Sequence, residues 1–232
     1  MSFKGKVVLV TGAAGNLGRA VAQAFAEQGA ALVLVDLDRK RLQQVHGDDN
    51  ETQLLAAADL RSAAPAAEVV KTAISRFGRI DVLANIAGGF RMGEPVHESS
   101  DETWQLMFDL NLRTLLNMSH SVVPAMLASG SGRIVNIGAN GALRGGALMG
   151  AYAATKSGVI RLTESMAAEL GKQGINVNCV LPTIIDTPEN RAAMPDADTS
   201  GWVAPAALAE VIRFLASDGA RAINGAALPV GT

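Results

Sequence analysis

The sequence predicts an α/β fold: one doubly wound parallel sheet of the Rossmann type with helices on both faces. Short apolar runs alternate with longer amphipathic segments along the whole chain, and no linker, repeat or low-complexity tract interrupts them. Such alternation gives parallel strands joined by right-handed crossovers. A content of 49% hydrophobic and 18% charged residues fits a sheet covered on both faces. With 232 residues, we expect residues 1–232 to form a single domain.

The expected strands are the short runs. The first, residues 6–11, reads KVVLVT and is apolar throughout its centre, as a strand buried on both faces should be. A second strand follows at residues 31–36 and a weaker third at residues 53–58. The remaining strands are expected at residues 80–85, 132–138 and 175–180, with a closing strand within residues 222–230.

The expected helices are the longer segments between these runs. The first, residues 16–29, ends at a glycine, the residue most often found just past a helix C-terminus. A long helix over residues 98–129 has Ser99 or Ser100 as its N-cap. Residues 187–203, rich in Pro, Asp and Met, are the least regular stretch. The other helices are expected at residues 38–46, 62–77, 149–172 and 204–217.

Composition argues against several classes of protein. A net charge of −2 without a Lys/Arg cluster disfavours nucleic-acid and anionic-membrane partners. Three scattered histidines and one cysteine predict no metal site, and the single Cys179 fits a reducing compartment. The first strand begins within a few residues of the start, and no apolar run is long enough to span a bilayer. We therefore expect a soluble, cytoplasmic protein. The histidines are His46, His97 and His120.

A glycine-rich turn, TGAAGNLG at residues 11–18, joins the first strand to the first helix. Glycine allows a tight turn and the close approach of a pyrophosphate, which binds the N–H groups at the helix N-terminus. Turns also recruit glycine for structural reasons alone. The position after the first strand of an alternating chain favours a dinucleotide site. The residues assigned to it are Gly12, Gly15, Asn16, Leu17 and Gly18.

Asp36 ends the second strand, where its carboxylate can accept both ribose hydroxyls of the adenosine half. The same charge repels a 2′-phosphate, so NAD(H) is favoured as the cofactor. Arg39 and Lys40 lie nearby and soften the discrimination, which leaves NADP(H) open. The alternative is a solvated aspartate that caps the next helix.

Tyr152 is the only tyrosine and precedes Lys156 by one helical turn, so both side chains share a helix face. A free phenol has a pKa of about 10. A nearby ammonium group favours the phenolate and brings its proton within reach of exchange. The lysine can also bind the nicotinamide ribose. The alternative is a tyrosine whose ring is simply buried on an amphipathic helix.

In their order along the chain, the motifs resemble the short-chain dehydrogenase/reductase family over essentially its whole length. Besides the turn and the Tyr152–Lys156 pair, they are Asp59-Leu60, Asn85-Ile86-Ala87-Gly88, Asn111, and Asn176-Val177-Asn178 followed by Pro182. The resemblance implies hydride transfer between a nicotinamide and a small organic substrate, with Tyr152 as acid/base. It implies that Asn111 helps hold a water that relays protons to Lys156, although this asparagine could equally be an ordinary helix-interior polar group.

The resemblance extends the predicted cofactor site and implies an oligomer. A homodimer or homotetramer would form through the long helices 98–129 and 149–172. The residues it adds for NAD(H) are Asp59, Leu60, Asn85, Ala87, Gly88, Tyr152, Lys156, Pro182, Thr183 and Ile185.

One departure concerns the substrate. Ala139 stands thirteen positions before Tyr152, where the family has a serine that hydrogen-bonds the substrate carbonyl. Losing one such donor costs a few kcal/mol of transition-state stabilisation. Asn140 could replace it through a shifted loop. Thr183, at a position that is often glycine, and the Gly15-Asn16 spacing also depart from most members.

These departures resemble the dihydropteridine reductase branch, as do Gly88-Gly89 and the stretch 181–202. A quinonoid dihydropterin is electron-poor, so its reduction would need less help from a polarising serine. The favoured substrate is therefore such a dihydropterin or a similar activated ring. The alternatives are an ordinary alcohol/carbonyl dehydrogenase with Asn140 or water in the serine's place, and an NAD(H)-binding sensor or structural subunit. Intact Tyr152, Lys156 and Asn111 argue against the last.

Overall fold

The computed structural model describes residues 2–231, which contain a seven-stranded sheet in the order β3-β2-β1-β4-β5-β6-β7. Every neighbouring pair of strands is parallel. The predicted doubly wound parallel sheet is confirmed. The strands are β1 (Val7–Thr11), β2 (Ala31–Asp36), β3 (Gln53–Ala57), β4 (Val82–Asn85), β5 (Gly132–Ile137), β6 (Ile175–Pro182) and β7 (Ala227–Val230).

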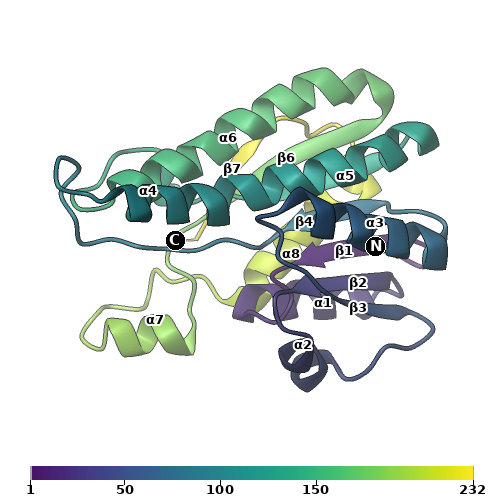
Figure 1. The fold of residues 1–232 in the computed structure, drawn as a ribbon, viewed down its shortest axis with the longest axis horizontal. Helices are drawn as coiled ribbons and strands as arrows, with labels where there is room; N and C mark the ends of the chain where they lie inside the picture. Colours follow the sequence, from purple (N-terminus) through teal and green to yellow (C-terminus); the bar gives the residue numbers. More distant parts are fainter. Residues whose placement is uncertain (1, 232) are drawn as a thin grey trace.

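Helices cover both faces of the sheet (Figure 1). The helices are α1 (Asn16–Ala26), α2 (Arg39–His46), α3 (Ala63–Phe77), α4 (Asp101–Phe108), α5 (Thr114–Ser129), α6 (Gly150–Leu170), α7 (Pro188–Ala193) and α8 (Pro205–Leu215). Alternate residues of the strands point to opposite faces. Val8 and Val10 pack with α1, α2 and α8, whereas Val7 and Leu9 pack with α3, α5 and α6.

The long helix predicted at residues 98–129 is interrupted. Ser100 caps its start by accepting a hydrogen bond from the Thr103 N–H, which confirms one of the two predicted caps. Between α4 and α5 the backbone forms a π-helical turn, Asp109–Arg113, which contains Asn111. Such insertions are rare and occur mostly at functional sites.

The irregular stretch 187–203 contains a helix that the sequence analysis did not predict. The Thr187 side chain accepts a hydrogen bond from the Asn190 N–H, and Pro188 occupies the first helical position of α7. In Figure 1, α7 stands apart from the sheet at the lower left, joined to it by loops. The loop of residues 86–100, between β4 and α4, extends toward the same side of the view. Both segments are therefore placed to border a site at one end of the sheet.

The described residues provide neither a membrane-spanning helix nor a cluster of three or more metal-binding side chains. Among residues 2–231, no helix combines the length and apolar character needed to cross a membrane. Within the same residues, no group of three or more His, Cys, Asp or Glu side chains could hold a metal ion.

Candidate active site

A cleft of about 380 Å³ opens where β1, β2, β3 and β4 end. The sheet order reverses between β1 and β4, and open α/β sheets bind their ligands outside such a point. The predicted cofactor residues that line this cleft are Gly12, Gly15, Asn16, Leu17, Gly18, Asp36, Asp59, Leu60, Ala87, Gly88 and Ile185. The structure thus gathers most of that predicted set along one surface.

At Gly12 and Gly18 the glycine turn leaves no room for a side chain. Gly12 has φ of +63°, and a Cβ there would lie 3.0 Å from the Ala87 Cα. A Cβ on Gly18 would lie only 2.1 Å from the carbonyl oxygen of Gly12. The N-cap of α1 is Gly15, which has no side chain to occupy the helix N-terminus. The turn therefore leaves this helix end on the cleft, a fit for a pyrophosphate.

Asp36 is fixed at the cleft by two backbone hydrogen bonds. Its Oδ2 accepts from the Ala14 N–H at 2.9 Å and its Oδ1 from the Leu37 N–H at 2.8 Å. The neighbouring Asp38, rather than Asp36, caps α2. The alternative assignment of Asp36 as a helix cap is therefore wrong.

The cation beside Asp36 differs from the predicted pair. Arg39 is held by Asp49 and by the carbonyl of Leu55, whereas Arg41 lines the cleft. At the end of β3, Arg61 forms a bidentate pair with Asp59, with Nη2–Oδ2 at 2.7 Å and Nε–Oδ1 at 2.9 Å. This guanidinium holds the pKa of the Asp59 carboxyl below its usual range. Two arginines that the sequence analysis did not assign, Arg41 and Arg61, thus line the cleft together with Asp36 and Asp59.

Lys156 is buried under the cleft. Its Nζ donates a hydrogen bond to the carbonyl oxygen of Ile137 at 2.8 Å. Burial lowers the pKa of this ammonium group to about 8. A Cβ on Gly88 would lie 3.3 Å from Nζ and 2.9 Å from Asn111 Oδ1, so the three residues converge at the cleft wall. An amine with this pKa can both hold and release a proton near neutral pH.

Tyr152 lies one turn earlier on α6. Its half-buried side chain packs beside the apolar cluster that contains Ala139 and Leu181, and its ring meets Phe90 edge-on. Burial raises the pKa of the phenol. The lowering of this pKa by the Lys156 ammonium stays a prediction, because in this structure burial alone sets the direction and disfavours the phenolate. The phenol is an acid that holds its proton until a base is present.

Asn111 holds the loop that follows β4. Its Oδ1 accepts from the Gly89 N–H at 3.0 Å, and its Nδ2 donates to the Gly89 carbonyl at 3.1 Å and to Thr155 Oγ1 at 3.3 Å. The side chain therefore connects the π-helical turn, the 86–100 loop and α6. Its role in a proton relay to Lys156 stays a prediction, because these contacts also suit a structural polar residue.

Several predicted residues lie outside the cleft. Asn85 is buried and donates to Asn136 Oδ1 at 2.9 Å, which ties β4 to β5. Pro182 ends β6, and Thr183 donates to the carbonyl of Gly201 at 3.1 Å. Tyr152 and Lys156 lie behind the cleft wall.

Other lining residues were not predicted. Asn190 and Thr187 come from α7 and its cap, and no sequence signal placed this segment at the cleft. Asn16 donates to Glu189 at 2.7 Å, which joins the glycine turn to α7. The remaining unpredicted lining residues are Leu37, Arg41, Ala58, Arg61, Ile86, Leu110 and Thr114, most of them neighbours of predicted ones.

Comparison with known proteins agrees with this geometry. The sequence model of the family described as short chain dehydrogenase matches residues 6–198. The chain belongs to this family. Ala139 is thus a methyl-bearing residue at the place where the resemblance expects a serine, and it is buried beside the Tyr152 cluster.

Similar short-chain dehydrogenases include proteins that are named for different activities. The chain is 34% identical to the (2S)-[(R)-hydroxy(phenyl)methyl]succinyl-CoA dehydrogenase subunit BbsD of Thauera aromatica, over 99% of this chain and 96% of that one. It is 35% identical to the D-threitol dehydrogenase of Mycolicibacterium smegmatis, over 97% and 91%. It is 32% identical to the 3-oxoacyl-[acyl-carrier-protein] reductase FabG of Thermotoga maritima, over 97% and 96%. None of these three is a dihydropteridine reductase.

Solved structures of the family share the whole fold. The crystal structure of NAD+-bound xylitol dehydrogenase superposes with a TM-score of 0.91 at 26% identity, covering 100% of this chain and 99% of that one. The 3-ketoacyl-(acyl-carrier-protein) reductase from Brucella melitensis, complexed with NADH, has a TM-score of 0.89 at 30% identity, covering 99% and 98%. The likeness therefore extends over essentially the whole chain.

Proposed function

We propose that this protein is an NAD(H)-dependent oxidoreductase that interconverts a secondary alcohol and its ketone, with Tyr152 as the acid/base. The main support for this proposal is that Lys156 Nζ and Asn111 Oδ1 both lie close to Gly88, which lines the cleft. Tyr152 lies one helical turn from Lys156. This arrangement supplies a proton source next to a dinucleotide site.

NAD(H) is the proposed cofactor for two reasons. Asp36 presents an anchored carboxylate at the cleft, which suits ribose hydroxyls and repels a 2′-phosphate. Solved relatives of the same fold were crystallised with NAD+ or NADH. When bound, the nicotinamide supplies or accepts the hydride.

The protein's own groups handle the proton. In the reducing direction, the Tyr152 hydroxyl donates a proton to the developing alkoxide oxygen, and in the oxidising direction it accepts one. The Lys156 ammonium, oriented by the Ile137 carbonyl, stabilises the phenolate left behind and returns a proton to it. Asn111 keeps Gly88-Gly89 in place between these groups and the cleft.

This proposal takes the alcohol/carbonyl alternative instead of the quinonoid dihydropterin. Three similar relatives are named as dehydrogenases of a hydroxy compound or of D-threitol, or as a 3-oxoacyl reductase. Ala139 is the observation that favours an activated ring, since it offers no hydroxyl to polarise a carbonyl. An assay with both carbonyl compounds and quinonoid dihydropterin therefore decides between the two substrate classes.

The test is a substrate panel with the purified protein. Ketones, secondary alcohols and quinonoid dihydropterin are each offered with NADH or NAD+ and with NADPH or NADP+, and Tyr152→Phe serves as the control. We expect turnover of carbonyl compounds with NADH that the variant lacks. Turnover of dihydropterin alone would replace the substrate, and cofactor binding without any turnover would favour a sensor or structural subunit.

We also propose that the protein is a cytoplasmic homodimer or homotetramer that pairs through α4, α5 and α6. Exposed apolar side chains on this surface, such as Phe108 and Leu127, support an interface there. Light scattering of the purified protein measures the assembly, and a monomer at micromolar concentration would contradict it.

A further inference from the structure

The wall beside Tyr152 is aromatic. Phe90 packs edge-on against the Tyr152 ring, with ring centroids 4.8 Å apart and planes at 84°. Phe90 nevertheless remains 57% exposed. An edge-to-face contact uses only part of a ring's surface. Phe90 therefore exposes a large apolar surface next to Tyr152.

Phe90 is also held in place. The preceding residue, Gly89, has both its N–H and its carbonyl bound by the Asn111 side chain. Gly89 also lies close to the π-helical turn, since a Cβ there would lie 2.6 Å from Leu110 Cδ1 and would require that side chain to shift. The backbone leading into Phe90 is thus fixed from two sides, and a rigid aromatic side chain binds a ligand at low entropic cost.

The loop that carries Phe90 is joined to a second loop, and both loops expose apolar side chains. The Gly93 N–H donates to the Leu148 carbonyl at 2.9 Å, which joins the 86–100 loop to the 139–149 loop. Met92 and Leu148 are exposed, and buried Ala139 lies in the apolar cluster beside Tyr152.

The charged side chains next to Phe90 in the chain are engaged elsewhere. Arg91 donates to Thr103 Oγ1, and Glu94 accepts from Thr103 and from the Ser100 N–H at the start of α4. These groups therefore do not serve hydroxyls of a substrate placed against Phe90. A polyol would bring several hydroxyl groups to a surface that offers carbon.

We propose that Phe90 is a specificity-determining residue that packs against a planar ring next to the reacting carbon. The substrate class is aryl or conjugated cyclic ketones and the matching alcohols, rather than open-chain polyols. This inference rests on the proposed alcohol/ketone function and names its substrate class.

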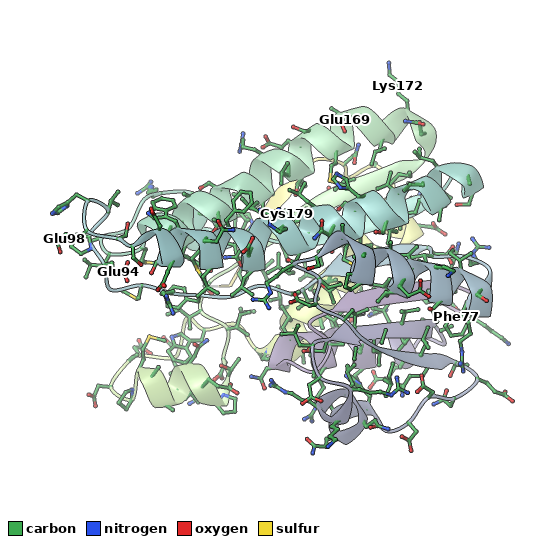
Figure 2. All side chains as sticks on the ribbon, viewed as in Figure 1. Phe77, Glu94, Glu98, Glu169, Lys172 and Cys179 are labelled. Carbon is green, nitrogen blue, oxygen red and sulfur yellow. The ribbon has the colours of Figure 1, made fainter. Side chains whose placement is uncertain are left out.

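The experiment compares four proteins: the parent, Phe90→Leu, Phe90→Trp and the control Phe77→Leu. Phe77 lies at the far end of the molecule from Glu94, which belongs to the loop of Phe90 (Figure 2). Each protein reduces acetophenone and 2-octanone with NADH, and KM and kcat are measured separately. Thermal unfolding verifies that each variant is folded.

We expect Phe90→Leu to lower kcat/KM for acetophenone about three- to tenfold, mainly through KM, and to change 2-octanone less than about twofold. Phe90→Trp keeps an aromatic surface and should retain the parental preference for acetophenone. Phe77→Leu should leave both substrates unchanged. An unaltered acetophenone to 2-octanone ratio in Phe90→Leu overturns the role of Phe90 and leaves the proposed function standing.

A second measurement separates the two proposals when neither ketone is turned over. Calorimetry then gives the affinity of each protein for acetophenone in the presence of NAD+. Weaker binding by Phe90→Leu than by Phe90→Trp supports the aromatic wall even though the proposed reaction fails. Equal binding by both variants would contradict the proposed role of Phe90 as well.

Discussion

Lys156 donates its hydrogen bond to the carbonyl of Ile137, the last residue of β5, at 2.8 Å, and it does so while only 6% exposed. A helix side chain is thereby anchored to a strand end next to the cleft. A charged amine at such a position costs stability, because burial disfavours its protonated form and lowers its pKa to about 8. The fold carries this cost at the site where proton transfer is proposed.

Replacing this amine should change how stability depends on pH. Below pH 8, Lys156 is charged in the folded and unfolded chains, and the cost of burying the charge is fully present. Between pH 8 and the ordinary value of 10.5, the unfolded chain binds more protons, so the parent gains stability as pH rises. Relative to Lys156→Met, the gain approaches about 3 kcal/mol, given 1.36 kcal/mol per pKa unit.

Urea unfolding of both proteins at pH 7.5, 8.5 and 9.5 measures this difference. Buried Cys179 has a pKa raised to about 11 and stays protonated over that range in the parent. A stability difference that does not change with pH would contradict the lowered pKa of Lys156.

Tyr152→Phe should lower kcat by at least about a hundredfold, the upper range being about ten-thousandfold for loss of a general acid. The fold should survive, because the ring still packs on Phe90 and the neighbouring apolar cluster. Steady-state kinetics and thermal unfolding measure the two effects. Near-parental turnover by the variant would remove Tyr152 from the mechanism.

Asp36→Ser should shift the cofactor preference toward NADP(H). The substitution removes the charge that repels a 2′-phosphate and leaves Arg41 on the cleft to receive it. A change of about 2 kcal/mol corresponds to a roughly thirtyfold change in the ratio of kcat/KM for NADH and NADPH. Asp38→Ser is the matched control, because Asp38 only caps α2. An equal shift in that control would assign the effect to the loss of a surface charge.

Ala139→Ser should raise kcat/KM for simple ketones, by roughly tenfold or more, since one well-placed donor contributes a few kcal/mol to the transition state. The residue lies at the end of β5 in the cluster beside Tyr152. Kinetics with a small aliphatic ketone measure the gain. No gain would show that the pocket, rather than the missing hydroxyl, excludes such substrates.

The sheet was predictable because its strands are apolar on both faces and punctuated by glycine. The helix α7 was missed because proline and aspartate dominate its surroundings, although Thr187 and Pro188 are ordinary cap and first-turn residues. The π-helical turn at Asn111 could not be read from the sequence. It accompanies hydrogen bonds between that side chain and Gly89, which are contacts of the folded chain.

The site was predictable where it follows strand ends, as at Gly12, Asp36 and Asp59. Asn85 and Thr183 carry the same local signal, yet their side chains bond to Asn136 and Gly201 and lie outside the cleft. The sign of the Tyr152 pKa shift was also beyond the sequence, because helical spacing shows that a lysine is near but not how deeply the phenol is buried.

The aromatic ring enclosed between Phe90 and the Ala139 cluster belongs to the only tyrosine of the chain. Ionisation of a phenol changes its ultraviolet absorbance, whereas the two tryptophans do not ionise. The absorbance change in an alkaline titration therefore reports on Tyr152 alone. Binding of any ligand that alters the ionisation of this ring can therefore be followed by ultraviolet absorbance, without a label.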